Sequence, residues 1–279
     1  MSYRHLLTLL GVTLIVLGAI ERGWFLVAVW LGCNFLILGI AHGRGSHGVF
    51  GKRPDGSLPL WSWLLFFPLL VYTTGVWHLI RLFNREPAQS VVTQNLTVGR
   101  RLLAFELTGE FDNYVDLTAE FSEPSAIRCS SAYRSFPILD GSAPRPEVLR
   151  AAIASLRPGR TFIHCAQGHG RTGLVALALL LSSGVVRSIE DGLRMLSAVR
   201  PGIRLNRDQR ACIELFAKEA GLPLPSTGRG MWGAKKGGGH RPPLQGDVAV
   251  RARASVQVFS TVGNPCASGR TWAKAVWRW

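Results

Sequence analysis

The residues best suited to do chemistry lie in one short stretch, "FIHCAQGHGRTG", at positions 162 to 173. Here an apolar run ends at Cys165, five loop residues follow, and Arg171 comes next. Backbone N–H groups of a tight loop at a helix N-terminus point inward and bind phosphate oxygens. A planar guanidinium can grip two such oxygens at once. The spacing therefore predicts a loop that holds a phosphate group against a cysteine thiol.

Cys165 is the candidate nucleophile of this loop. A helix N-terminus and a nearby cation both favour a thiolate over a thiol, and both would act on Cys165 if a helix begins near Thr172. The thiolate could then attack phosphorus and form a phosphocysteine. We expect Thr172 to donate its hydroxyl to the sulfur and His164 to orient the loop through ring hydrogen bonds, while His169 faces either substrate or solvent.

The backbone of the loop would hold the phosphate. Glycines at 168, 170 and 173 permit the close approach and the unusual backbone conformations that such a cradle requires. The predicted phosphate-binding residues are Ala166, Gln167, Gly168, His169, Gly170 and Arg171.

The elements that must position this loop follow from the pattern after about residue 88. Short β-rich runs are expected at 94–102 and 114–121 and a buried strand at 161–165, with helices at 146–156, 172–184, 188–201 and 206–221. Strands that alternate with helices of this length imply a partly parallel sheet covered by helices. We therefore predict an α/β catalytic domain at 88–221.

Residues 1–87 have a different character, with three long apolar segments at about 5–20, 23–41 and 58–80. A membrane-spanning helix needs roughly 20 apolar residues. The third segment has tryptophans near both ends, as in interfacial belts, but Pro68 and His78 keep a membrane-surface or buried helix open as the alternative. We expect two or three transmembrane helices and no cleaved signal peptide.

The orientation of these helices cannot be read from charge, because four Lys or Arg residues would flank one side of the membrane and five the other. The placement of the catalytic part in the cytoplasm rests instead on its chemistry, since a reactive thiol suits a reducing compartment. The five cysteines include no CxxC pair, so no zinc site is predicted.

The last segment, 222–279, is rich in Gly and Pro and supplies +8 of the net charge of +15, with nine Lys or Arg against one Asp. Its composition predicts a disordered tail. A basic excess beside apolar segments suits anionic lipid headgroups, and the sequence lacks the interleaved aromatic and basic residues that would indicate nucleic-acid binding. The expected partners are thus the bilayer and a phosphorylated substrate.

The motif "HCAQGHGRTG" resembles the signature of the cysteine-based protein tyrosine phosphatases, HCxxGxxR followed by Ser or Thr. Its GxGRTG ending looks like that of the atypical dual-specificity phosphatases. The likeness extends to "YRSFPILDGSAP" upstream and "VRPGIRLNRDQ" downstream, about residues 90–221. It implies a central sheet flanked by helices and hydrolysis of phosphate monoesters without a metal or cofactor.

Hydrolysis also needs an acid for the leaving oxygen and a base for water. The resemblance implies an aspartate on a mobile loop ahead of the cysteine, and Asp140 stands 25 residues before Cys165, between Pro and Gly residues. Asp112 and Asp116 read as surface or strand-end carboxylates. Asn206 could lie near the site or cap a helix.

Other interpretations fit less well. A rhodanese would leave Asp140 without a role, and a low-molecular-weight phosphatase would place its aspartate after the cysteine. Zinc binding by His164, Cys165 and His169 lacks a fourth ligand. A phosphate-binding pseudophosphatase is the non-enzymatic alternative. For substrate, the resemblance favours phosphotyrosine, phosphoserine or phosphothreonine on proteins, with a phospholipid headgroup such as a phosphoinositide or phosphatidylglycerophosphate as the alternative.

Overall fold

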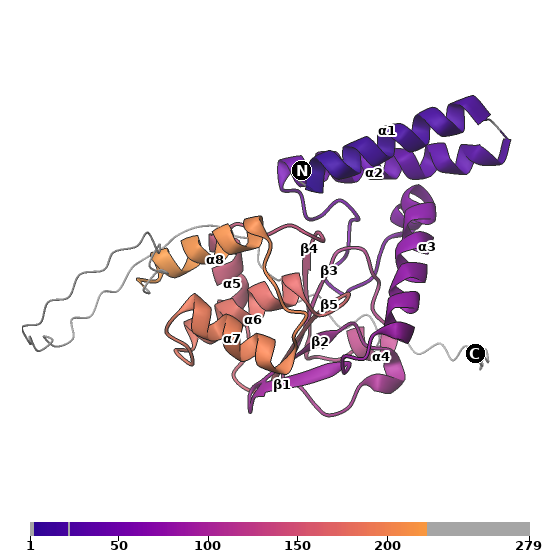
Figure 1. Cartoon of the computed structure of the whole chain (residues 1–279). Coiled ribbons are helices and arrows are strands. Elements are labelled where there is room, and N and C mark those ends of the chain that lie inside the picture. The colour runs from indigo at the N-terminus through magenta and orange to yellow at the C-terminus, as the bar shows by residue number, and fades with distance from the viewer. Residues whose placement is uncertain (1–2, 22, 222–279) are drawn as a thin grey trace, which may run out of the picture.

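The computed structural model of the chain describes residues 3–21 and 23–221 (Figure 1). The predicted tail at 222–279 lies outside the described residues.

A five-stranded sheet forms the centre of residues 88–221, the predicted catalytic part. Its strands are β1 (Gln89–Thr93), β2 (Leu96–Arg100), β3 (Asn113–Thr118), β4 (Tyr133–Ile138) and β5 (Thr161–Cys165). Their spatial order is β1-β2-β5-β3-β4, with β1 antiparallel to β2 and the other pairs parallel. All five residues of β5 are buried, as expected for a central strand with covered faces.

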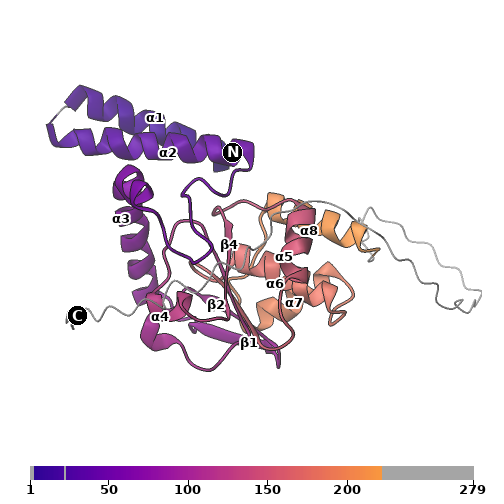
Figure 2. The same ribbon diagram turned by 180° about the vertical axis from the view of Figure 1, so that it is seen from behind.

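Helices cover the sheet on both sides. One face carries α5 (Pro146–Ala154), α6 (Gly170–Ser182), α7 (Ile189–Val199) and α8 (Arg207–Glu219), as Figures 1 and 2 show. The other face is closed by the short α4 (Ser125–Arg128) and the segment that contains η2 (Ala104–Glu106). Successive residues of β5 serve the two faces, because Phe162 packs in one apolar cluster and Ile163 in the other. The predicted α/β fold is confirmed.

Two strands were not predicted from the sequence. β1 lies at one edge of the sheet, and β4 contains Pro137, which lowers its strand signal. Proline is tolerated in a strand at the edge of a sheet, and β4 is the last strand in the order.

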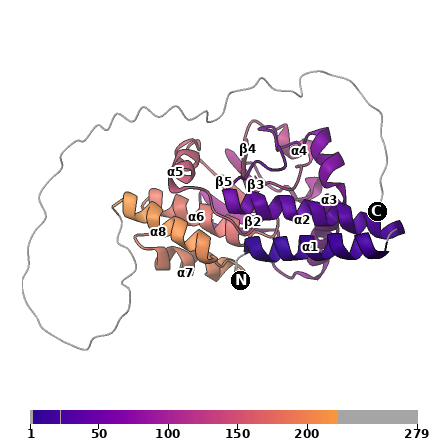
Figure 3. The ribbon, with the colours of Figure 1, turned by 90° about the horizontal axis from the view of Figure 1, so that it is seen from above.

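The apolar N-terminal segments form α1 (Tyr3–Glu21), α2 (Leu26–Arg44) and α3 (Leu60–Phe83), with a 3-10 turn, η1 (Gly23–Phe25), before α2. All three helices are long and apolar enough to cross a membrane. α1 and α2 lie side by side as a hairpin, which Figure 3 shows from above. Glycines make the close packing possible, since a Cβ on Gly11 would come within 2.8 Å of the Gly32 carbonyl.

The hairpin runs across one end of α3, and α3 lies along the catalytic part (Figures 1 and 2). One apolar cluster joins the two parts, because residues of all three helices pack with two residues of the catalytic part. Its members include Leu7, Phe35, Phe66, Leu69, Leu70, Ala119 and Leu139. The helices and the catalytic part therefore share a hydrophobic core.

Candidate active site

The cysteine loop lies where β5 ends and α6 begins. Cys165 is the last residue of β5 and Gly170 the first of α6. The Cys165 side chain is almost enclosed, with 4% of the residue exposed. The Gly168 N–H donates a 3.2 Å hydrogen bond to its Sγ. The sulfur therefore lies at the start of α6, where the first turn of a helix has free N–H groups and a partial positive charge.

Gly168 is required by its surroundings. Its φ is +75°, a conformation that residues with a Cβ rarely adopt. A Cβ at this position would also collide with the Gly99 carbonyl of β2. The loop is thus folded tightly against the neighbouring strand.

Donors outside the loop hold its carbonyl groups. The Trp77 indole N–H donates to the Ala166 carbonyl at 2.8 Å. The buried Arg200 guanidinium donates to the carbonyls of Gln167 at 2.8 Å and Gly168 at 2.9 Å. In a trans peptide the C=O and the following N–H point in opposite directions. Fixing these carbonyls outward therefore turns the next three N–H groups toward the centre of the loop, where a phosphate would sit.

Arg171, the second residue of α6, is buried and held by three groups. Its guanidinium forms two hydrogen bonds with the Glu120 carboxylate, at 2.8 and 2.9 Å, and donates to the Ile138 carbonyl at 3.0 Å. The Asp140 carboxylate lies 3.2 Å away. Burial alone would lower the pKa of Arg171, but the carboxylates of Glu120 and Asp140 outweigh it and raise this pKa well above its ordinary value. The guanidinium is thus permanently charged and fixed in orientation beside the loop.

Asp140 is the most exposed of the predicted site residues, with 66% of its side chain accessible. It follows β4 on a short loop whose backbone is held from several sides. The hydrogen bonds join Leu139 N–H to Nδ1 of His47 (3.3 Å), the Asn206 amide to the Gly141 carbonyl (2.8 Å), and the Gln209 amide to the Ser142 carbonyl (3.3 Å). The backbone is anchored while the carboxylate stays open to a ligand.

Asn206 fulfils both of its predicted roles. Its side-chain oxygen accepts a 2.9 Å hydrogen bond from the Gln209 N–H and so caps α8. Its amide group meanwhile holds Gly141 beside Asp140. The start of α8 therefore helps to position the loop that carries the candidate acid.

Two predicted hydrogen bonds are not formed among the described residues. The ring nitrogens of His164 have no hydrogen-bond partner there, and its Nε2 lies 3.8 Å from a carboxylate oxygen of Asp116, so its role in orienting the loop stays a prediction. The ring packs instead between aromatic side chains, stacking on Phe162 and meeting Tyr114 edge-on. The buried Thr172 hydroxyl likewise has no partner among the described residues and does not donate to the Cys165 sulfur.

His169 points to the rim of the loop. Its Nε2 lies 2.6 Å from Oε2 of Glu86, and the other carboxylate oxygen of Glu86, Oε1, accepts a 2.9 Å hydrogen bond from the Gly202 N–H. Burial favours the neutral form of Glu86, but the hydrogen bond with His169 and the charge of Arg200 lower its pKa below the ordinary value. Glu86 thus ties His169 and Arg200 together at the edge of the site.

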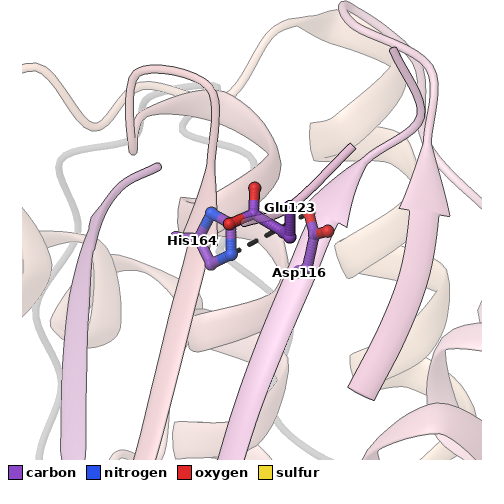
Figure 4. A group of neighbouring side chains, drawn as sticks. All are labelled: Asp116, Glu123 and His164. Carbon is purple, nitrogen blue, oxygen red and sulfur yellow. Dashed lines mark ion pairs between the residues drawn. The ribbon is translucent and has the colours of Figure 1, made fainter. Parts of the chain in front are cut away.

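A buried cluster of titratable residues lies beneath the loop, formed by Asp116, Glu123 and His164 (Figure 4). Asp116 is fully buried within β3, so its assignment to the surface or a strand end is wrong. Burial would raise its pKa, but the Lys52 ammonium, 2.5 Å away, holds this pKa well below its ordinary range. Burial lowers the pKa of His164 to about 4, so the ring is neutral at pH 7.

Glu123 shows the opposite shift. Burial and the nearby Asp116 charge raise its pKa to about 7, although its carboxylate pairs with the Arg101 guanidinium at 2.8 Å. Arg101 also lies over the Trp77 ring, 5.1 Å from its centroid. The cluster is therefore linked to the donor that holds the Ala166 carbonyl.

This cluster is also the one place among the described residues where three candidate metal ligands meet, with ligand atoms within 4.8 Å of one another. Lys52 and Arg101 already place two positive charges on its carboxylates. A divalent cation would have to displace the Lys52 ammonium from Asp116 and Thr118. The residues present fit an internal ion-pair network better than a metal site.

The mouth of the loop opens into a cavity of about 420 Å³. Cys165, Arg171, Asp140 and Glu120 line its polar end. Side chains of α1, α2 and α3, most of them apolar, line much of the rest. The thiol is thus reached through a space that the candidate membrane helices enclose.

No protein-family model matches the sequence, and no curated protein matches it. Several solved structures do match the fold of the chain. Tk-PTP in its active form is 22% identical, covering 47% of this chain and 97% of its own, with a TM-score of 0.41. Human DUSP28 is 15% identical over 49% of this chain and 97% of its own (TM-score 0.41), and PTPMT1 in complex with PI(5)P is 14% identical over 48% and 96% (TM-score 0.39). At these identities the likeness concerns the fold.

Several residues of the site escaped the sequence analysis. Glu120, Arg200 and Lys52 were not singled out as site residues, and Trp77 was interpreted as an interfacial tryptophan, whereas it is buried against the loop. A buried arginine in "AVRPGI" and a glutamate after a β-run are weak signals, because charged residues usually lie on the surface. Only their contacts with the loop and with Arg171 reveal their roles.

Proposed function

We propose that this chain is a membrane-anchored hydrolase of phosphate monoesters that works through a phosphocysteine. The observation that carries the proposal is the enclosed Cys165 thiol at the centre of a loop whose N–H groups turn inward, with Arg171 held beside it. These groups together would bind a tetrahedral dianion with its phosphorus facing the sulfur.

In the first step the Cys165 thiolate attacks phosphorus. The S–P bond forms as the bond to the ester oxygen breaks, and Asp140 gives its proton to the departing oxygen. Arg171 and the loop N–H groups stabilise the charge on the three equatorial oxygens. In the second step the Asp140 carboxylate takes a proton from water, the water oxygen attacks phosphorus, and the S–P bond breaks to release phosphate and the thiolate.

Thr172 is assigned a supporting role in the second step. Its hydroxyl is buried near the start of α6 without a partner among the described residues, and an unsatisfied buried hydroxyl is costly. A rotation of this hydroxyl toward the departing sulfur would satisfy it and stabilise the thiolate.

The test is phosphate release from p-nitrophenyl phosphate by the full chain in detergent, with Cys165→Ser as the blank. We expect turnover that Cys165→Ser abolishes, that vanadate inhibits competitively, and that survives EDTA. Vanadate binding without turnover in either protein would favour the pseudophosphatase instead. Loss of turnover in EDTA would indicate a different mechanism.

We further propose that residues 1–87 anchor a catalytic domain at 88–221, that 222–279 forms a basic tail, and that the catalytic domain faces the cytoplasm. A membrane-impermeant thiol reagent applied to intact cells tests the last point. Rapid labelling that Cys165→Ser prevents would place the domain on the outer side.

A further inference from the structure

We infer that the substrate of this site is a lipid that carries a single phosphate monoester, with its apolar chain lying between α3 and the α1–α2 hairpin. This inference rests on the proposed function and names its substrate class. Phosphorylated side chains of proteins, which the resemblance favours, become the contrasting outcome of the test.

The first argument is the wall that α3 gives to the cavity. Leu69, Thr73, Val76, Trp77 and Ile80 all line it. From Leu69 these positions recur every three or four residues, with Val76 and Trp77 side by side in one turn, so they form one continuous face of the helix. The cavity therefore follows α3 for about three turns, and the cysteine loop meets this face at Trp77.

The second argument is the opposite wall. Tyr3 and Leu7 of α1 and Phe35 and Leu38 of α2 line the same cavity. Tyr3 and Leu7 are four residues apart and Phe35 and Leu38 are three apart, so the two side chains of each pair lie on one face of their helix. The space that begins at Cys165 is thus closed by one face of each of the three candidate membrane helices.

The third argument is the orientation of α3. Among the α3 side chains that do not line the cavity, Val71, Leu79, Leu82 and Phe83 are apolar and exposed. Exposed apolar faces of this size on a long apolar helix suit contact with lipid. α3 therefore separates the bilayer from a cavity that is itself mainly apolar.

These walls decide between classes of substrate. A lipid whose phosphate reaches Cys165 can keep its chain in apolar surroundings, whereas each methylene forced into water would lower occupancy about fourfold. A phosphorylated protein side chain would bring its peptide groups toward the helices, where they lose water without gaining hydrogen-bond partners. The cavity favours the lipid.

Charge limits the headgroup. Among the described residues that line the cavity, Arg171 is the only lysine or arginine, and it already faces Glu120 and Asp140. Those two carboxylates would repel a second phosphate. The site therefore suits one phosphate monoester near the apolar chain, as in phosphatidate, and disfavours inositol lipids with several phosphates.

The experiment compares kcat/KM of the full chain in mixed micelles for five substrates. They are dioleoyl phosphatidate, dihexanoyl phosphatidate, glycerol 3-phosphate, a phosphotyrosine peptide and p-nitrophenyl phosphate, with Cys165→Ser as the blank. We expect kcat/KM for dioleoyl phosphatidate to exceed that for glycerol 3-phosphate and for the peptide by at least about a hundredfold. The kcat/KM for dihexanoyl phosphatidate should lie between the value for dioleoyl phosphatidate and the value for glycerol 3-phosphate.

A pair of variants on α3 tests the chain path. Val76→Trp fills the wall of the cavity and should lower the ratio of phosphatidate to p-nitrophenyl phosphate hydrolysis about tenfold, because about two methylenes would be displaced into water. Val71→Trp adds the same side chain on the exposed face of the same helix and should leave the ratio unchanged.

The outcomes separate this inference from the proposed function. If no substrate, p-nitrophenyl phosphate included, is hydrolysed above the blank, the proposed function fails. If p-nitrophenyl phosphate is hydrolysed but the peptide or glycerol 3-phosphate equals phosphatidate, or if the two tryptophan variants give the same ratio, the lipid assignment is overturned and the phosphatase remains.

Discussion

At the scale of residues, the site is organised by charges that fix one another before a substrate arrives. Glu120 holds both outer nitrogens of Arg171 at hydrogen-bond distance. A guanidinium that is already oriented loses less conformational entropy when it binds a phosphate. Asp140 lies close enough to pair with Arg171 but remains largely exposed, so substrate can meet the candidate acid and the phosphate clamp together.

Asp140→Ala should lower kcat for phosphatidate about a thousandfold while KM changes little, because proton transfer to the leaving oxygen is lost but phosphate binding is kept. The loss should be much smaller for p-nitrophenyl phosphate, whose leaving group needs little protonation. Steady-state kinetics with both substrates measures this. Asp208→Ala, at an exposed carboxylate, is the control. Equal losses of kcat on the two substrates would show that a residue other than Asp140 is the general acid.

Glu123 gives a prediction about pH. Its pKa is about 7 in the folded protein against an ordinary 4.5, because burial and Asp116 disfavour its ionised form. The native state therefore holds an extra proton between these values, and the stability it brings is complete below pH 4.5 and lost as pH rises through about 7.

The Tm of the wild type should fall relative to that of Glu123→Gln by about 3 °C or more between pH 5 and pH 8. Thermal unfolding in detergent measures this, and the comparison cancels the titration of groups common to both proteins. Glu110→Gln, at an exposed position, is the control. A Tm difference that stays constant across this range would mean that Glu123 is already ionised.

At the scale of elements, the strand, loop and helix around Cys165 depend on donors from other elements. Arg200 comes from the end of α7 and Trp77 from α3, and both bind loop carbonyls. Backbone N–H groups form an anion cradle only when the carbonyls are turned away. The shape of the loop is thus decided by its neighbours as much as by its glycines.

Arg200→Met should lower kcat/KM about a hundredfold, because released carbonyls let the loop shift away from the productive geometry. As Arg200 is a positioning residue, the diagnostic readout is the inhibition constant for vanadate, which should rise with KM. Arg204→Met, at an exposed arginine nearby, is the control. If Arg200→Met has normal vanadate affinity and only a lower Tm, then Arg200 stabilises the fold and does not position the loop for phosphate.

At the scale of the whole molecule, the segment that holds the three apolar N-terminal helices is joined to the predicted catalytic part by a buried ion pair as well as by apolar packing. Lys52, from the segment between α2 and α3, reaches Asp116 and Thr118 inside the sheet. Removing one partner of such a pair leaves an uncompensated buried charge. The N-terminal segment therefore contributes to the stability of the predicted catalytic part.

Lys52→Met should destabilise the protein by about 3 kcal/mol, and adding Asp116→Asn should recover part of the loss by removing the stranded charge. Thermal unfolding in detergent, followed for both single variants and the double variant, measures the coupling. Arg53→Met changes the neighbouring exposed residue and should have little effect. Additive losses in the double variant would show that the two residues do not act as a pair.

The sequence alone determined the features that are local along the chain. The strand, Cys165, the loop, Arg171 and the start of α6 fall within one short stretch, so their spacing defines their geometry. The apolar helices and the α/β alternation are likewise written in local periodicity. β4 was missed because Pro137 obscures an edge strand whose place only the sheet order reveals.

Only the tertiary structure decided which distant groups complete the site. Glu120 lies 51 positions from Arg171 and Trp77 lies 89 from Ala166, and no periodicity links residues so far apart. The same holds for the cavity at the mouth of the loop, which exists because α3 and the hairpin pack over the loop. Local patterns follow from backbone geometry, whereas these contacts depend on how the elements pack together in three dimensions.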